Sequence, residues 1–147
     1  MRWFEDFHIG DVVEFGPVTV SEEDIVGFAE RYDPQPFHID PDAAAESMYG
    51  GLIASGWHTV SLFMGMFVRA VLLDSASLGS PGVEEIRWLA PVRPGDALRG
   101  RSTIVEARAS ETSASRGTVF TSNEVVNQDG TVVLTMKARG FFQRRPV

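Results

Sequence analysis

Residues 55–74 read SGWHTVSLFMGMFVRAVLLD, and this run decides the fold class. Its length and its scarcity of charge predict one long helix over roughly 57–74. Because nearly all faces of that helix are apolar, we expect neighbouring elements to cover most of its circumference. A helix of this kind in a small domain typically lies across a curved sheet.

Four β-rich segments follow the apolar run. They cover residues 83–92, 97–109, 116–126 and 131–143. The last alternates, with Leu134 and Met136 on one face and Thr135 and Lys137 on the other. Residues 127–130 (NQDG) have the composition of a hairpin loop. With a further strand expected over 12–20, the order of elements predicts an α+β fold whose helices lie on one face of an antiparallel sheet.

A helix is predicted between the first strand and Asp33. Ser21 and the three acidic residues after it are typical of a helix start. The helix must end near Asp33, because Pro34 and Pro36 disfavour helical backbone in the residues before them. Residues 33–38 are therefore predicted to form a stiff, extended loop.

A second short helix is predicted after this loop. Asp40 can cap it, and Pro41 suits its first turn. The alanines that follow carry it to about Met48, and the glycines at 50 and 51 then interrupt the chain.

The composition is that of an ordinary globular protein. The chain has 147 residues, of which 44% are apolar and 22% charged, and we expect a single domain over 1–147. A formal net charge of −7 argues against non-specific binding to nucleic acid or to an acidic membrane. Because there is no Cys, disulfides and thiolate chemistry are excluded.

The sequence predicts a cytoplasmic protein. Its first ten residues lack the basic and then apolar pattern of a secretory signal. The most apolar run, 60–73, is shorter than the roughly 20 residues of a membrane span, and it contains Arg69. A core helix is the preferred interpretation, with no membrane partner.

Asp33 and His38 are the first candidates for chemistry. They flank a segment that two prolines make rigid, so holding both side chains in place costs little further entropy. A carboxylate and an imidazole over one cavity can share a water and move protons near neutral pH, since free imidazole titrates near ~6.5. The alternative is a proline-rich turn with a capping Asp and a surface His.

Ser55 and Gly56, at the start of the long helix, are the second candidates. The first amides of a helix have no acceptor inside it and carry the positive end of the dipole. Gly allows a ligand oxygen to approach closely, so this start can bind a carbonyl that becomes an oxyanion. Plain capping by Ser55 is the alternative.

The remaining polar residues are less specific. His8 has no evident partner, and His58 is predicted to be a core or interface histidine. Asp40 and Asp42 near His38 match no metal site, so no metal or cofactor is expected.

Arginine supplies every basic residue except Lys137, and many arginines fall in the strand half. They either clamp the phosphates of a nucleotide-bearing substrate or form a solvated strand face paired with Glu. The arginines concerned are Arg87, Arg93, Arg99, Arg101, Arg139, Arg144 and Arg145.

Three segments together resemble a known family. Residues 33–44 (DPQPFHIDPDAA) resemble the motif of the MaoC-like dehydratases, the (R)-specific enoyl-CoA hydratases with a hot-dog fold. Residues 51–59 (GLIASGWHT) resemble the start of the family's central helix, and 89–96 (LAPVRPGD) its strand and turn. The matches follow the family's order, and with the flanking elements the resemblance covers nearly the whole chain.

The resemblance implies a fold, an assembly and a reaction. It implies a long helix wrapped by a curved antiparallel sheet, in a homodimer or a larger assembly of dimers. The catalytic Asp and His map onto Asp33 and His38, and the backbone amide at the helix start maps onto Gly56. The implied activity is reversible hydration of a trans-2-enoyl thioester of coenzyme A or acyl carrier protein. Thioester hydrolysis and acyl-thioester binding without catalysis are the alternatives.

Two positions depart from the family pattern, and both bear on the substrate. Gln35 stands where the family commonly has Asn, and Tyr32 stands where a Gly often precedes the Asp. Met48 and Trp88 are further candidates for lining an acyl tunnel, although such residues are more often simple core. The predicted substrate-binding residues are Gln35, Ser55, Trp57, Tyr32 and Phe37.

Overall fold

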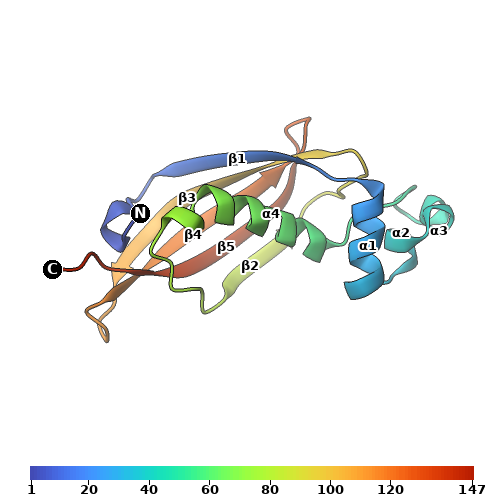
Figure 1. Cartoon of the computed structure of the whole chain (residues 1–147). Helices are drawn as coiled ribbons and strands as arrows, with labels where there is room; N and C mark the ends of the chain where they lie inside the picture. Colours follow the sequence, from blue (N-terminus) through green and yellow to red (C-terminus); the bar gives the residue numbers. More distant parts are fainter.

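Five antiparallel strands form one sheet that curves around the apolar helix α4 (Figure 1). The computed structural model describes residues 1–147. The strand order is β1-β3-β4-β5-β2, so the first strand lies at one edge and β2 at the other. The strands are β1 Val12–Thr19, β2 Val83–Trp88, β3 Ala97–Ala109, β4 Arg116–Val126 and β5 Val132–Gln143. The predicted α+β architecture is confirmed.

Helix α4 spans Gly56–Ala70, and a 3₁₀ turn, η2, continues from Leu72 to Asp74. Gly56–Asp74 is long and apolar enough for a membrane span, but here it packs against the sheet as the core helix. Phe63 and Met66 are buried beneath it, whereas Trp57 and Met64 remain about half exposed. The expectation that neighbours cover most of the helix is therefore wrong within this chain, because one sheet covers only one face.

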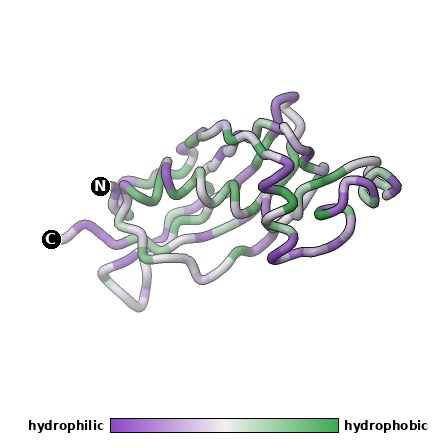
Figure 2. Tube along the Cα trace, turned by 45° about the vertical axis from the view of Figure 1, so that its right-hand side comes forward, coloured by the Kyte–Doolittle hydropathy of each residue, from purple (hydrophilic) through white to green (hydrophobic).

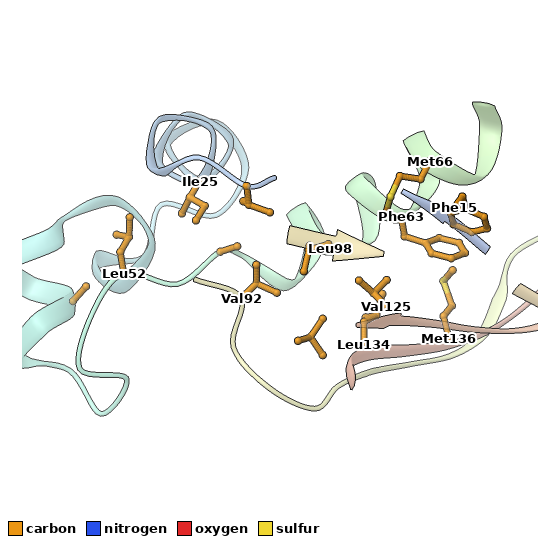
Figure 3. Close-up of a cluster of buried hydrophobic side chains, with 14 residues drawn as sticks. Phe15, Ile25, Leu52, Phe63, Met66, Val92, Leu98, Val125, Leu134 and Met136 are labelled. Atoms are coloured by element: carbon orange, nitrogen blue, oxygen red, sulfur yellow. The ribbon is translucent and has the colours of Figure 1, made fainter. Parts of the chain in front are cut away.

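The main hydrophobic core fills the space between α4 and the concave face of the sheet (Figure 3). Phe63 of α4 meets Phe15 of β1, with 5.6 Å between the ring centroids. Leu98, Leu134 and Met136 close the core from the strands. Figure 2 shows hydrophobic residues along α4 and hydrophilic residues along the C-terminal tail.

Three helices gather beside the N-terminal end of α4 (Figure 1). Helix α1, Glu22–Tyr32, begins as predicted, because the hydroxyl of Ser21 accepts a hydrogen bond from the Asp24 amide at 3.1 Å. Helix α3, Pro41–Glu46, is capped by Asp40. The extended loop predicted over 33–38 is wrong in part: Pro36–Ile39 form a short helix, α2, with Pro36 in its first turn.

Most of the strand arginines pair with acidic residues at the surface. The pairs include Arg87–Glu85, Arg139–Glu84, Arg101–Glu14, Arg144–Glu5 and Arg145–Asp6. This confirms the solvated, Glu-paired interpretation for these residues. Exposed pairs of this kind contribute little stability, commonly below about 1 kcal/mol each.

Candidate active site

Asp33 and His38 meet at the junction of α1 and α2. Asp33 directly follows the last residue of α1, and the turn of α2 brings His38 back toward it. His38 Nε2 lies 3.2 Å from Asp33 Oδ2. His38 is buried, and the Asp33 side chain is only partly exposed.

The main chain fixes the orientation of the His38 ring. Nδ1 lies 2.8 Å from the carbonyl oxygen of Ile53. Because a carbonyl oxygen only accepts hydrogen bonds, Nδ1 carries a hydrogen. Nε2 is therefore the nitrogen that exchanges a proton with Asp33 or with a molecule between them.

Two further side chains hold the Asp33 carboxylate. The hydroxyl of Ser55 donates to Oδ2 at 2.8 Å, and the amide Nε2 of Gln35 donates to Oδ1 at 2.8 Å. Burial by itself raises the pKa of Asp33, but the hydrogen bonds from Gln35 and Ser55 and the adjacent His38 outweigh burial and lower the pKa below its usual range. The carboxylate is therefore kept ionised and oriented toward His38.

The first two amides of α4, those of Gly56 and Trp57, have no hydrogen-bond acceptor in the chain. The capping alternative for Ser55 is wrong, because its hydroxyl bonds to Asp33 and not to the helix start. A Cβ on Gly56 would lie 2.4 Å from the indole of Trp88. The Trp88 ring therefore packs directly against the backbone at the start of α4, and only glycine leaves room for it there.

One cavity of about 600 Å³ joins these groups. Asp33, His38 and Gly56 all line it, so the residues that carry the carboxylate, the imidazole and the unpaired amide meet at one space. The predicted residues Gln35, Phe37, Trp57 and Trp88 line the cavity too.

Two predicted lining residues lie elsewhere. Tyr32 is 61% exposed and packs on Phe28, one turn earlier on α1. Met48 is 91% exposed, beyond the end of α3. Ser55 is fully buried and does not line the cavity, so its contact with the site is through Asp33.

Several lining residues were not predicted. Strand β2 ends at Trp88, and residues 89–92, which were predicted to continue it, form a cavity wall. The Leu89 amide bonds to the Val133 carbonyl at 2.9 Å, and the Val92 carbonyl accepts from Ala54 at 2.9 Å. Pro91 within this stretch has no amide to offer a strand partner.

The guanidinium of Arg93 holds a second wall in place. It donates to the carbonyls of Tyr49 and Gly51. Tyr49 lines the cavity, and no sequence pattern marks it. Thr59, one turn into α4, is a further lining residue that was missed.

The other histidines lie outside this cavity. His58 is buried, as predicted, and stacks on Phe28 with 4.7 Å between the rings. Its Nδ1 has no hydrogen-bond partner, and burial lowers its pKa against the opposing charge of Asp24. His8 is exposed, and its Nδ1 lies 3.5 Å from Oδ2 of Asp11.

Comparison with known proteins defines the class. The family described as "MaoC like domain" matches residues 6–127. The MaoC-like dehydratase from Rhodospirillum rubrum is 36% identical, superposes with a TM-score of 0.92, and each chain covers 100% of the other. The 3-hydroxyacyl-thioester dehydratase Z of Mycobacterium tuberculosis is 30% identical over 74% of this chain and 73% of its own.

Protein MaoC from Klebsiella aerogenes is 34% identical over 69% of this chain. The chain spans only 30% of the length of that protein. The chain belongs to the MaoC-like dehydratase family and has its hot-dog fold.

Proposed function

We propose that the protein is a hydro-lyase that reversibly adds water to a trans-2-enoyl thioester, giving the 3-hydroxyacyl thioester. The observation that carries the proposal is the single cavity onto which Asp33, His38 and the unpaired Gly56 amide converge. Membership of the MaoC-like dehydratases and the similarity to a 3-hydroxyacyl-thioester dehydratase support it. The thioester is carried by coenzyme A or by acyl carrier protein.

In this mechanism, Asp33 and His38 act on one water. The pair accepts a proton from the water as its oxygen bonds to C3 of the enoyl group, and it returns a proton to C2. Because Ser55 and Gln35 keep Asp33 ionised, the carboxylate can stabilise a protonated His38 through Nε2. The pair therefore passes a proton from the water oxygen to C2 of the substrate and returns to its starting protonation state.

The helix start stabilises the charge that develops on the thioester. As C3 is attacked, negative charge moves to the thioester oxygen, and the Gly56 amide is free to donate to it. The positive end of the α4 dipole favours the same charge. The apolar faces of Phe37, Trp57 and Trp88 enclose the acyl group.

The reaction is tested with crotonyl-CoA and the purified protein. We expect loss of the conjugated enoyl absorbance and formation of 3-hydroxybutyryl-CoA, with no release of free thiol. Thiol release at the rate of substrate loss contradicts the proposal and identifies a thioesterase. Stoichiometric acyl-CoA binding with no turnover, across enoyl chains of graded length, identifies a binding module.

The acid side of the pH profile is expected to depend on Gln35. The lowered pKa keeps Asp33 ionised at pH values where a free carboxylate is already protonated, so kcat/KM falls only at still lower pH. In Gln35→Met the carboxylate loses one donor, its pKa rises, and the acid limb moves to higher pH. The pH dependence of kcat/KM measures this shift.

Gln143→Met is the matched control, because Gln143 is exposed on β5 and makes no side-chain hydrogen bond. We expect it to keep the wild-type profile. If Gln35→Met also keeps that profile, the hydrogen bond does not set the ionisation of Asp33.

We also propose that the protein works as a homodimer and resides in the cytoplasm. The outer edge of β2 has no strand partner, and exposed edges are sites of strand pairing. Trp57, Trp88 and Leu89 are about half exposed beside the cavity, which supports burial against a second copy.

A further inference from the structure

Arg93 lies in the turn between the wall residues 89–92 and β3, and its side chain reaches the segment that joins α3 to α4. Its Nη2 donates to the Tyr49 carbonyl at 2.5 Å, and its Nη1 donates to the Gly51 carbonyl at 3.3 Å. No backbone amide donates to either carbonyl. The guanidinium is therefore the group that ties residues 49–51 to the turn.

Arg93 differs in this from the arginines of the strands. Arg87, Arg101 and Arg139 pair with glutamates at the surface, whereas Arg93 bonds only to main-chain oxygens of one short segment. Hydrogen bonds from a charged donor are stronger than neutral ones, and the fork of a guanidinium can bond two oxygens at once. The side chain is thus suited to fixing the position of residues 49–51.

The main chain of Arg93 is also held in place. Its amide donates to Oδ2 of Asp96 at 2.9 Å, and its carbonyl accepts from the Asp96 amide at 3.1 Å. Asp96 is buried, and its Oδ1 accepts from the side chain of Gln128, in the β4–β5 hairpin, at 3.0 Å. A guanidinium on so fixed a backbone loses little further freedom when it bonds to the two carbonyls.

Residues 49–51 have few other restraints. On one side, the Ser47 hydroxyl accepts from the Tyr49 amide at 3.2 Å. On the other, Leu52 is buried in the main core (Figure 3). Gly50, with a φ of +66°, and Gly51 lie between these anchors, and glycine is the residue with the greatest backbone freedom. Without the guanidinium, we expect this stretch to lose its fixed position.

Tyr49 links this stretch to the candidate active site, because it lines the cavity. Its ring packs on Phe37, another lining residue, with 5.3 Å between the ring centroids. Phe37 in turn packs edge-on against His38, at 4.6 Å. Tyr49 makes no hydrogen bond to Asp33 or His38, so it bears on the space for the acyl group and not on proton transfer.

We propose that Arg93 is a positioning residue for substrate binding, which holds Tyr49 against Phe37 as one wall of the acyl site. The proposal rests on the proposed function in taking the occupant to be an acyl thioester. The alternative is that Arg93 binds the phosphates of coenzyme A directly. The bonds to Tyr49 and Gly51 favour the positioning role, because they engage the guanidinium within the chain.

Calorimetric titration of the whole protein tests this with a ketone analogue of butyryl-CoA, in which a methylene group separates the sulfur from the carbonyl. The analogue is neither hydrated nor hydrolysed, so it measures binding alone. We expect Arg93→Met to raise its Kd by about tenfold or more, since charge-assisted hydrogen bonds are lost. The pantetheine form of the analogue, which has no phosphate, should show the same loss.

Arg99→Met is the matched control, because Arg99 is exposed on β3 and forms no ion pair. It should bind both forms of the analogue as the wild type does. Tyr49→Ala should weaken binding by itself, and adding Arg93→Met to it should cause no further loss, because Arg93 acts through Tyr49. In the hydration of crotonyl-CoA, Arg93→Met should raise KM and leave kcat near the wild-type value.

Four results would overturn the positioning role. They are absence of binding by the wild type, equal affinities of Arg93→Met and Arg99→Met, additive losses in the double variant, and a loss confined to the coenzyme A form. The last result identifies direct phosphate binding. If the binding losses appear but crotonyl-CoA is not hydrated, the proposed reaction is wrong and the positioning role stands. If Arg93→Met does not fold, Arg93→Lys replaces it, because a single ammonium lacks the fork that bonds both carbonyls.

Discussion

Replacing Asp33 by Asn is expected to lower kcat for hydration of crotonyl-CoA by about 10²–10⁴-fold, the usual contribution of a general acid or base. The amide keeps the size of the carboxylate and can still accept from Ser55. It carries no charge to stabilise a protonated His38, and it cannot take up a proton. His38→Ala removes the other half of the pair and should cost a similar factor.

Steady-state kinetics, circular dichroism and thermal unfolding together check this result. Asp42→Asn is the matched control, because Asp42 is exposed near the same segment and does not line the cavity. The double variant Asp33→Asn/His38→Ala should lose about as much as either single variant, since two residues that share one proton act as a unit. Wild-type turnover in folded Asp33→Asn and His38→Ala would refute the assignment.

Gly56→Ala is expected to lower kcat/KM by about 10²–10³-fold, the cost of losing one oxyanion donor. The added methyl would overlap the Trp88 indole at 2.4 Å, so the ring or the start of α4 has to move. A displaced helix start carries the Gly56 amide away from the thioester oxygen. Gly27→Ala, on α1 with nothing near its Cβ, should leave the activity unchanged.

A second substitution tests whether Gly56→Ala lowers activity through its overlap with the Trp88 indole. Trp88→Ala opens the space that the new methyl occupies. If the amide position is what Gly56→Ala disturbs, adding Trp88→Ala restores most of the activity, measured against Trp88→Ala alone. A Gly56→Ala protein that matches the wild type in kcat/KM argues against an oxyanion role for this amide.

The backbone elements were predictable because their signals are local. The apolar run at 55–74 and the alternation after residue 131 each follow from the period of a helix or a strand. Helix α2 could not be predicted, because four residues are too few to show a helical period and Pro36 is equally typical of a residue that ends the preceding helix. The end of β2 could not be predicted from the sequence, because Leu89 and Val92 continue the apolar character of the strand beyond its last residue, Trp88.

The candidate site was predictable only in part. Asp33, His38 and Gly56 belong to short motifs, and the fold brings them to one cavity. Tyr32 is one residue from Asp33, yet it is exposed, because Tyr32 is the last residue of α1 and packs on Phe28 of that helix, whereas the backbone of Asp33 is no longer helical. Tyr49, Thr59 and Leu89 reach the cavity from three separate segments, and only tertiary packing decides that.

The bond from His38 Nδ1 to the Ile53 carbonyl bears on how such a protein diversifies. Substitution of Ile53 changes a side chain but leaves its backbone carbonyl. The hydrogen bond that sets the tautomer of His38 therefore does not depend on which residue occupies position 53. The side chains of Tyr49 and Leu89 line the cavity and make no hydrogen bond to Asp33 or His38. The wall of the cavity can therefore change its shape while the contacts that orient Asp33 and His38 stay in place.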